Sequence, residues 1–191
     1  MATKDHQSEP IESASETLQR IFDGHGSVLG SQMADESSRY DVLKKTDFPK
    51  PQRTRRIAVA NQKGGVGKTT STVNTAAALA NKGAQVLVID MDPQGNASTA
   101  LGVFHASGEP SVYDVIEGRS DLGDVITVCP DFPTLDVVPA SIDLSGAELE
   151  VADLPNRNTL LKEALDLYLR QSDKHYDYVF IDCPPSLGLL V

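Results

Sequence analysis

Short apolar runs and segments with helical periodicity alternate along the chain from residue 56 onward. Residues 56–61 and 85–90 are apolar runs whose length and composition predict buried strands. Two further strands are predicted at 135–139 and 176–182. Helices are predicted in the intervening segments, at 69–81, 112–117, 144–151 and 158–170.

The order of these elements predicts the class of fold. Residues 56–90 are predicted to form a strand, a helix and a second strand, which is a βαβ unit and implies a parallel sheet with a right-handed crossover. The helix at 158–170 has apolar residues at the i, i+3, i+4 and i+7 positions of one face. We therefore predict an α/β fold with three layers and a mostly parallel sheet, in a domain that spans residues 53–191.

Residues 1–52 differ from this domain in composition. They are rich in Ser, Glu, Asp, Gln and Lys and poor in β-branched residues, which predicts a flexible leader. One short helix is predicted inside the leader, beginning at Pro10 and ending at Gly24 or Gly26. Either this helix packs on its own domain or forms transiently, or it docks onto a partner as an amphipathic peptide. The sequence alone leaves both interpretations open.

Charge is distributed unevenly along the chain. The formal net charge is −10, and residues 1–56 contain nine Lys and Arg against nine Asp and Glu, so residues 57–191 carry the whole excess of acid. This balance argues against a nucleic-acid groove over most of the body, because binding to phosphates requires clustered cations. A local basic patch, or one outside these residues, is still compatible with it.

The N-terminus and the cysteines argue against several other classes of protein. No apolar region of a secretory signal follows Met1, and no run approaches the roughly 18 to 20 apolar residues of a transmembrane helix. Cys129 and Cys183 belong to no CxxC pair, which predicts two reduced thiols. We therefore expect a soluble, cytoplasmic protein that does not bind a membrane.

The strongest chemical motif is the glycine-rich segment between the first predicted strand and the first predicted helix. It reads Lys63-Gly64-Gly65-Val66-Gly67-Lys68-Thr69-Thr70. Glycines allow positive φ angles and let backbone N–H groups turn toward phosphate oxygens, and the start of the helix adds its positive dipole end. Lys68 is placed to reach the β- and γ-phosphates of ATP, and the Thr69 hydroxyl suits Mg²⁺. The segment therefore predicts a phosphate loop that binds a nucleotide.

The phosphate loop departs from the common pattern at its start. Gln62 stands where the pattern Gly-x-x-x-x-Gly-Lys-Thr has its first glycine, and a second lysine, Lys63, follows it. Lys68 already serves the near side of the phosphates. We therefore interpret Lys63 as a cation that projects toward the nucleotide of another subunit, rather than as an ordinary solvated charge.

Two of the predicted strands, 85–90 and 176–182, end in an aspartate. Ligands bind at the carboxyl ends of parallel strands, so both strand ends are expected to adjoin the phosphate loop. Asp92 lies in the polar turn after the second strand and is the candidate to orient the attacking water, in a turn that could respond to the γ-phosphate as a switch. For Asp90 a structural role, bonding loop amides, is left open. Asp182 closes the last strand and is predicted to hold Mg²⁺.

Three segments together resemble the ParA/Soj family of partitioning ATPases, which belongs to the deviant Walker A group of P-loop proteins. The segments are 60–70, 90–98 and 181–187. The resemblance covers about residues 56–191. Within the family, the segments are similar in particular to those of the chromosomal ParA proteins of actinobacteria. MinD-like proteins of the group lack the Asp-Pro-Gln-Gly-Asn turn that begins here at Asp92.

The resemblance assigns a role to each candidate residue. It implies that Lys63 crosses a dimer interface, that Lys68 is the phosphate-loop lysine and that Thr69 is a magnesium ligand. It also implies that Asp92 is needed for hydrolysis and that Asp182 is the Walker B carboxylate that serves the magnesium ion.

The resemblance further implies a cycle with ATP and Mg²⁺ as cofactors and slow hydrolysis. ATP closes a homodimer that binds nucleoid DNA without sequence preference, and a ParB-type centromere-binding partner stimulates hydrolysis and releases the dimer. Family members continue beyond the Walker B strand, so we expect a chain truncated after Val191, with its DNA contacts in residues outside it. The alternatives are a cargo-positioning or cell-polarity ATPase of the same superfamily that does not use DNA, and an inactive fragment.

Overall fold

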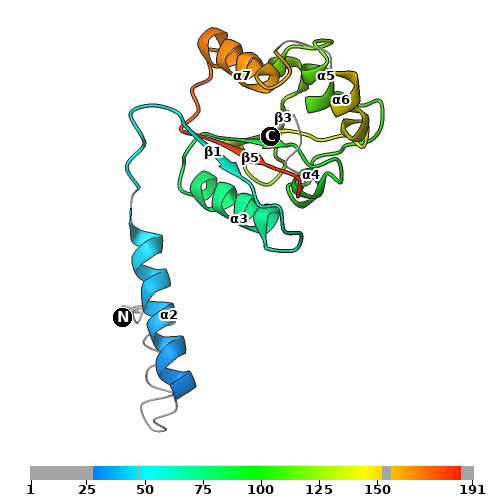
Figure 1. Ribbon diagram of the computed structural model, residues 1–191. Coiled ribbons are helices and arrows are strands. Elements are labelled where there is room, and N and C mark those ends of the chain that lie inside the picture. The colour runs from blue at the N-terminus through cyan, green and yellow to red at the C-terminus, as the bar shows by residue number, and fades with distance from the viewer. Residues whose placement is uncertain (1–27, 47, 152–155, 186–191) are drawn as a thin grey trace, which may run out of the picture. The chain divides into compact units, whose positions relative to one another are not determined.

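The computed structural model describes residues 28–46, 48–151 and 156–185. The chain divides into two units, Met1–Phe48 and Pro49–Val191. The described part of the first unit forms helix α2 (Val28–Lys45; Figure 1). The sequence pattern did not reveal this helix, because its few apolar residues do not gather on one face. The short helix predicted to begin at Pro10 lies outside the described residues.

The second unit is built around a five-stranded sheet with the order β1-β5-β2-β4-β3. Four of its strands run parallel, and they are β1 (Arg55–Val59), β5 (Tyr178–Asp182), β2 (Val86–Asp90) and β4 (Leu135–Val138). Strand β3 (Thr127–Val128) pairs antiparallel with β4 at one edge. The mostly parallel sheet predicted from the sequence is confirmed, with β5 lying between the two strands of the predicted βαβ unit.

Helices cover both faces of this sheet (Figure 1). Helix α3 (Lys68–Asn81) packs on one face. On the other face lie α5 (Val112–Ile116), α6 (Leu144–Glu150) and α7 (Leu160–Gln171). The three-layer α/β fold predicted from the alternation of strands and helices is therefore confirmed.

The central strand β2 supplies side chains to both cores, because successive residues of a strand point to opposite faces. Val86 and Val88 pack in one core with Ala76 of α3. Leu87 and Ile89 pack in the other core, with side chains of α5, α6 and α7. All five residues of β2 are buried, as expected for a strand that is covered on both faces.

Strand β1 forms where it was predicted, but the prediction that it is buried was wrong. Arg55, Arg56, Ile57 and Ala58 are all exposed, and Ile57 retains 37% of its accessible surface. The reason is the place of β1 in the described sheet, where it pairs with β5 alone and forms an edge. The apolar composition of a strand does not reveal how many neighbours the strand has.

Two short helical elements escaped the sequence analysis. Helix α4 (Asn96–Ala100) follows the turn that contains Asp92, and the 3₁₀ helix η1 (Leu122–Val125) precedes β3. Both are too short to show a helical period. Among the helices of the described residues, none has both the length and the apolar character that crossing a membrane requires.

Candidate nucleotide-binding site

The glycine-rich loop connects the end of β1 to the start of α3. Gly65 and Gly67 have φ angles of 70° and 86°, in the left-handed region that favours glycine. A Cβ atom built on Gly64, Gly65 or Gly67 would meet no other part of the described protein within 4 Å. The loop is therefore bordered by open space, which leaves room for a ligand close to its backbone.

Helix α3 begins directly at this loop. Its N-cap is Gly67, which offers no side-chain hydrogen bond, and the Ser71 N–H makes the first turn's bond to the Gly67 carbonyl oxygen (2.8 Å). The N–H groups of Lys68, Thr69 and Thr70 are thus left for an external acceptor. An anion suits this position, because the helix dipole places partial positive charge there.

Asp182 lies beside the loop at the C-terminal end of β5. The register of the sheet places it between Val59 of β1 and Asp90 of β2. Its carboxylate accepts hydrogen bonds from Thr69 Oγ1 (2.7 Å) and Thr72 Oγ1 (3.1 Å). Fold and register thus bring together Thr69 and Asp182, the two residues that the sequence analysis selected as magnesium ligands.

Asp90 and Asp92 are close in sequence but differ in surroundings. Asp90 is fully buried, and its Oδ2 accepts hydrogen bonds from both the N–H and the hydroxyl of Ser98, at 2.8 Å each. Its Oδ1 accepts one from the Asp92 N–H (3.1 Å), so Asp90 bonds loop amides, as the structural interpretation expected. Asp92 is half-buried, and its Oδ1 accepts a hydrogen bond from the Gln94 N–H (3.0 Å).

A cavity of about 420 Å³ joins the phosphate loop to the Asp92 turn. The phosphate-loop residues 64–70 line it together with Asp92, Asn96 and Pro185. Lys63 is exposed and does not line the cavity, and its backbone N–H donates to Asn61 Oδ1 (3.0 Å). Within one subunit, Lys63 therefore lies apart from the cavity that residues 64–70 and Asp92 line. Asp182 is not among the lining residues and is joined to the cavity through its hydrogen bond with Thr69.

Burial makes the charged forms of the Asp90 and Asp182 carboxylates at this edge of the sheet unfavourable. Burial raises the pKa of Asp182, although hydrogen bonds from Thr69 and Thr72 oppose the change, and the nearby charge of Asp92 adds to it. Burial likewise raises the pKa of Asp90 to about 6. A cation would relieve this cost, since it favours the charged carboxylates. The oxygen donors of Thr69 and Asp182 beside an anion-binding loop fit a hard cation such as Mg²⁺.

Two residues of this site were not predicted from the sequence. Thr72 contacts Asp182, and Pro185 lines the cavity. Asn96, which also lines it, ends the turn that was predicted to respond to the γ-phosphate. Thr72 could have been identified, because a residue three positions after Thr69 lies on the same face of a helix. The place of Pro185 depends on how two loops approach each other in space, which no local pattern of residues encodes.

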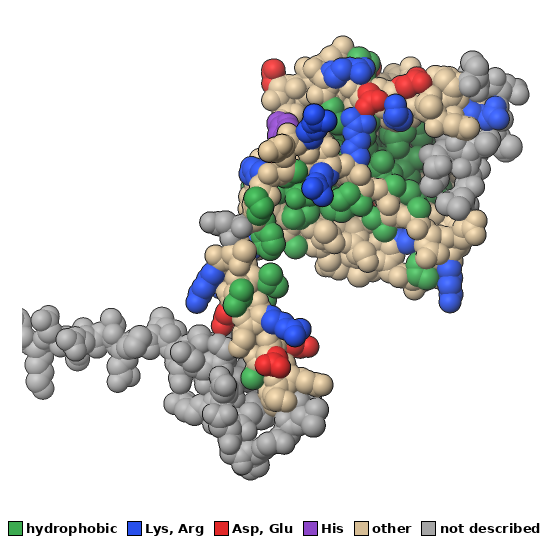
Figure 2. All heavy atoms as spheres, turned by 60° about the vertical axis from the view of Figure 1, so that its left-hand side comes forward, with side chains coloured by type: hydrophobic (Ala, Val, Ile, Leu, Met, Phe, Trp, Pro, Cys, Tyr) green, Lys and Arg blue, Asp and Glu red, His purple; other side chains and the backbone are tan. Residues whose placement is uncertain are grey.

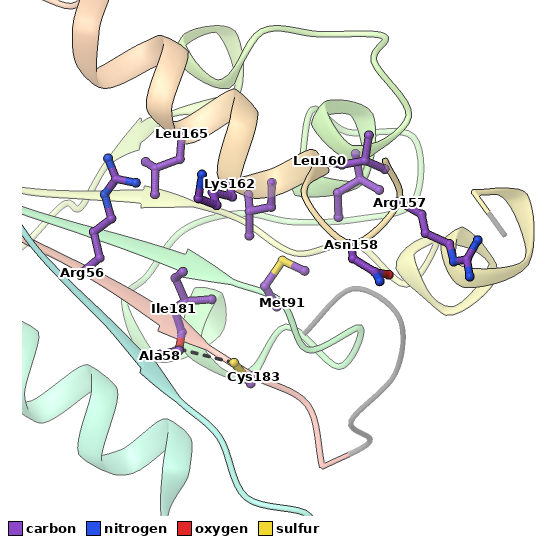
Figure 3. Close-up of a pocket in the computed structure, with 12 residues that line it drawn as sticks. Arg56, Ala58, Met91, Arg157, Asn158, Leu160, Lys162, Leu165, Ile181 and Cys183 are labelled. Atoms are coloured by element: carbon purple, nitrogen blue, oxygen red, sulfur yellow. Dashed lines mark hydrogen bonds between the residues drawn. The ribbon is translucent and has the colours of Figure 1, made fainter. Parts of the chain in front are cut away.

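A second cavity, of about 340 Å³, lies beneath α7 and beside the edge strand β1 (Figure 3). Its lining is mostly apolar, with Ala58, Leu161 and Ile181 among its residues, and it also includes Arg56 and Lys162. Figure 2 shows a face of the molecule on which hydrophobic side chains lie among Lys and Arg side chains. None of the residues selected for chemistry lines this second cavity.

The fold and the phosphate-loop cavity together define a P-loop protein. A family model described as an AAA domain matches residues 54–191. Sporulation initiation inhibitor protein Soj of Bacillus subtilis is 49% identical over 134 residues, which are 70% of this chain and 51% of that protein. Chromosome partitioning protein ParA of Caulobacter vibrioides is 47% identical over 134 residues, which are 70% of this chain and 49% of that protein. The chain belongs to the ParA/Soj family of AAA-domain proteins, and it spans about half the length of these relatives.

One of the solved structures that are similar to the chain in both sequence and fold bears directly on the site. It is cobyrinic acid a,c-diamide synthase from Mycobacterium smegmatis with a bound ATP analogue and magnesium. The two chains are 41% identical with a TM-score of 0.64, and the match covers 72% of this chain and 52% of the other. The name of that protein states a different activity from those of Soj and ParA. The likeness therefore supports the fold and the nucleotide site more directly than it supports a biological role.

Proposed function

We propose that this protein binds ATP with Mg²⁺ at the phosphate loop and hydrolyses it slowly, in a cycle that segregates chromosome or plasmid DNA. The observation that carries the proposal is the contact between Thr69 and Asp182 beside an open phosphate loop, with Asp92 lining the same cavity. The ATP analogue and magnesium bound by the M. smegmatis protein support this choice of ligands. The partitioning role rests on the names of the relatives.

Residues in and beside the cavity have separate roles in binding the nucleotide. Backbone N–H groups of residues 64–70 hold the phosphate oxygens, and the Lys68 ammonium balances the charge of the β- and γ-phosphates. Thr69 and Asp182 hold Mg²⁺, which when bound neutralises further phosphate charge. Thr72 keeps the Asp182 carboxylate in place through its hydrogen bond to Oδ1.

Hydrolysis depends on how the attacking water is placed. Asp92 orients this water, because the residue lines the cavity and the Gln94 N–H holds one of its carboxylate oxygens. Positioning is sufficient for this role, since phosphoryl transfer through a loose transition state gains more from alignment and charge stabilisation than from a strong base.

Lys63 acts across a homodimer that forms with ATP. It is exposed and does not line the cavity of its own subunit, which suits a side chain that serves the nucleotide of a second copy. The Lys63→Ala protein should therefore bind ATP but fail to dimerise with it, as measured by light scattering. An ATP-dependent dimer of unchanged stability would reject the role in trans.

The partners of the cycle are non-specific DNA and a ParB-type centromere-binding protein, in the cytoplasm at the nucleoid. The acidic balance of residues 57–191 is consistent with DNA contacts that lie in residues outside this chain, which is where we place them. The test is DNA binding by the full-length protein at several salt concentrations, with ATP and with ADP. The proposal predicts salt-sensitive binding that appears with ATP and disappears with ADP. Absence of DNA binding with every nucleotide would overturn it.

The same acidic balance favours one alternative, an ATPase that positions cargo or marks cell polarity without DNA as its track. Both functions use the same nucleotide cycle, so ATP hydrolysis does not separate them. The DNA-binding experiment does. An ATP-dependent dimer that hydrolyses ATP and ignores DNA at low salt would favour the alternative.

A further inference from the structure

The imidazole ring of His105 packs against the turn that carries Asp92. Gly95 is buried in this turn and has a φ angle of 61°. A Cβ atom on Gly95 would lie 2.3 Å from His105 Cε1 and 2.6 Å from His105 Nδ1, so the ring occupies the space where a side chain would stand. A hydrogen bond of 2.8 Å also joins His105 Nε2 to Thr99 Oγ1 in α4. His105 therefore contacts both the turn and the helix that follows it.

Helix α4 is also held by the buried carboxylate at the end of β2. Ser98 donates its N–H and its hydroxyl to Asp90 Oδ2, and its hydroxyl oxygen accepts the Ala140 N–H (3.1 Å). Ser98 thus fixes the helix to the sheet, whereas the neighbouring Thr99 fixes it to His105. Asp90 also accepts the Asp92 N–H (3.1 Å) at the start of the turn, and the His105 ring adds packing on Gly95, the most freely rotating residue of the turn.

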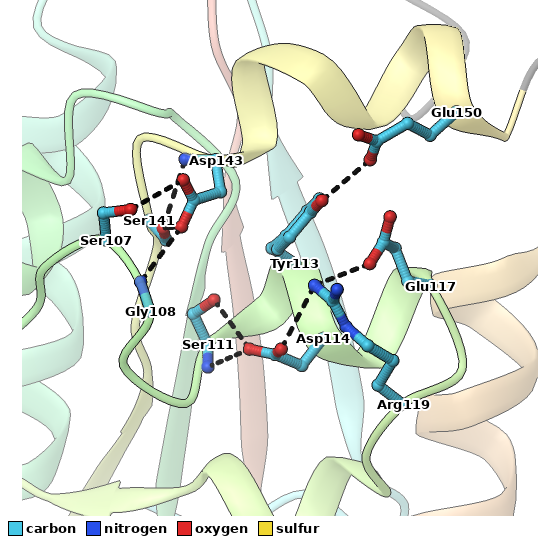
Figure 4. Close-up of polar contacts among 10 residues, drawn as sticks. All are labelled: Ser107, Gly108, Ser111, Tyr113, Asp114, Glu117, Arg119, Ser141, Asp143 and Glu150. Atoms are coloured by element: carbon cyan, nitrogen blue, oxygen red, sulfur yellow. Dashed lines mark hydrogen bonds and ion pairs between the residues drawn. The ribbon is translucent and has the colours of Figure 1, made fainter.

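The loop that presents His105 is itself attached at both ends. On one side, the Val103 N–H donates to the Ser98 carbonyl oxygen (3.0 Å). On the other side, Asp143 accepts hydrogen bonds from the Ser107 hydroxyl (2.9 Å) and the Gly108 N–H (3.2 Å), as Figure 4 shows. The ring is therefore presented by a loop that is fixed to α4 and to the segment before α6.

We propose that His105 is a positioning residue for ATP hydrolysis, which holds the Gly95 turn so that Asp92 stays directed into the nucleotide cavity. The inference rests on the proposed function. His105 does not line the cavity, so it acts on Asp92 through Gly95 and Thr99 and not by touching the nucleotide. Loss of the ring frees Gly95 to leave its left-handed conformation, and the water-orienting carboxylate then samples unproductive positions. Because His105 is not among the residues that line the nucleotide cavity, we expect nucleotide affinity to be unaffected.

The first experiment compares His105→Ala, Thr99→Val and Thr99→Ser in the full-length protein. We expect His105→Ala and Thr99→Val to lower kcat about 10-fold while the Kd for ATP changes less than about twofold. Thr99→Ser retains the hydroxyl and should keep the wild-type kcat. The matched control is His175→Ala, which removes an exposed histidine that does not line the cavity. A His105→Ala protein with wild-type kcat would overturn the inference, and so would equal losses from Thr99→Ser and Thr99→Val.

The second experiment tests the contact without reference to activity. Gly95→Ala should lower the Tm in the wild-type background by more than backbone strain alone, because the new methyl group displaces the ring and with it the hydrogen bond to Thr99. In the His105→Ala background the same change should lower the Tm by much less, since only the strain of the positive φ angle is left. Equal losses in the two backgrounds would show that the ring does not pack on Gly95 and would overturn the inference.

The two proposals fail in different ways. A protein with Asp92→Ala that hydrolyses ATP at the wild-type rate counts against the proposed function itself. If Asp92→Ala is inactive and His105→Ala is fully active, only the positioning role of His105 is rejected. A wild-type protein without ATPase activity rejects both, whatever the Tm experiment shows.

Discussion

Two loops at the carboxyl edge of the sheet carry glycine in the left-handed region, and they differ in what surrounds them. Around Gly64, Gly65 and Gly67 of the phosphate loop, the described protein leaves open space. Around Gly95 of the Asp92 turn, the space is filled by the ring of His105. The first loop is shaped for a ligand that comes from outside, whereas the second is held by the protein's own side chain.

This difference separates two uses of the same residue type. In the phosphate loop, glycine allows close approach of the backbone to phosphate, so substitutions there should act on nucleotide affinity. In the Asp92 turn, glycine leaves room for packing, so substitutions there should act on stability and on the alignment of Asp92. Substitutions at each loop, measured for both affinity and stability, test this division.

The largest effect is expected for Lys68→Ala in the phosphate loop. Removal of the ammonium that balances the phosphate charge should weaken ATP binding by at least about 100-fold, measured by titration with a fluorescent ATP analogue. The free energy of unfolding without nucleotide should change little, because Lys68 has no protein ion pair in the described residues that would be lost. A large loss of stability without nucleotide would contradict the view that this loop is shaped for an external ligand.

Gly95→Ala should instead destabilise the fold. Strain at a φ angle of 61° and displacement of the His105 ring together should cost about 2 kcal/mol of unfolding free energy, measured by urea denaturation. Gly118→Ala is the matched control, since Gly118 has a φ angle of 71° and nothing within 4 Å of an added Cβ. It should cost only about 1 kcal/mol, for strain alone. Equal costs at the two positions would remove the distinction between the loops.

Gly67→Ala tests whether glycine in the phosphate loop is needed for ATP affinity. We expect the affinity for ATP to fall about 10-fold, because a methyl group enters the space beside the phosphates. Gly83→Ala is the control, with a φ angle of 80° against 86° at Gly67 and equally open surroundings. Both variants should lose about 1 kcal/mol of stability from strain, and only Gly67→Ala should lose affinity. Wild-type affinity in the Gly67→Ala protein would argue against phosphate binding at this loop.

The smallest effect concerns the pH dependence of stability at Asp90. Its pKa is about 6 in the folded protein, above the ordinary value of 3.8, so the folded state binds more protons than the unfolded state between these two values. The free energy of unfolding should therefore decrease as pH rises toward 6 and level off above it. Between pH 5.5 and 7.5 this contribution is about 1 kcal/mol. It should be absent from Asp90→Asn, and an identical pH dependence in the two proteins would show that Asp90 is not responsible.

The sequence predicted the architecture well where periodicity is strong. The buried run that became β2 and the amphipathic helix α7 formed close to their expected bounds. The error at β1 arose because burial depends on the number of neighbouring strands, which local composition does not contain. Helix α4 was missed because five residues after a polar turn show no period, and because its position depends on side-chain contacts with Asp90 and His105 that no residue pattern indicates.

For the candidate site, the sequence predicted the residues better than it predicted their contacts. Lys68, Thr69 and Asp182 could be selected because their residue types occur at fixed places relative to predicted strands and helices. The contact of Thr69 with Asp182 depends on the insertion of β5 beside β1, which the sequence order does not reveal. The packing of His105 on Gly95 was also beyond prediction, because an isolated histidine in a polar loop carries no local signal.

The central claim is that Asp92 orients the water that attacks ATP bound at the phosphate loop. It is tested most directly by single-turnover hydrolysis of Mg²⁺–ATP in the full-length Asp92→Ala protein, with ATP affinity measured on the same sample. The account predicts that the Kd for ATP stays within about twofold of wild type while the hydrolysis rate falls at least about 100-fold. Hydrolysis at the wild-type rate by protein that binds ATP normally would contradict it.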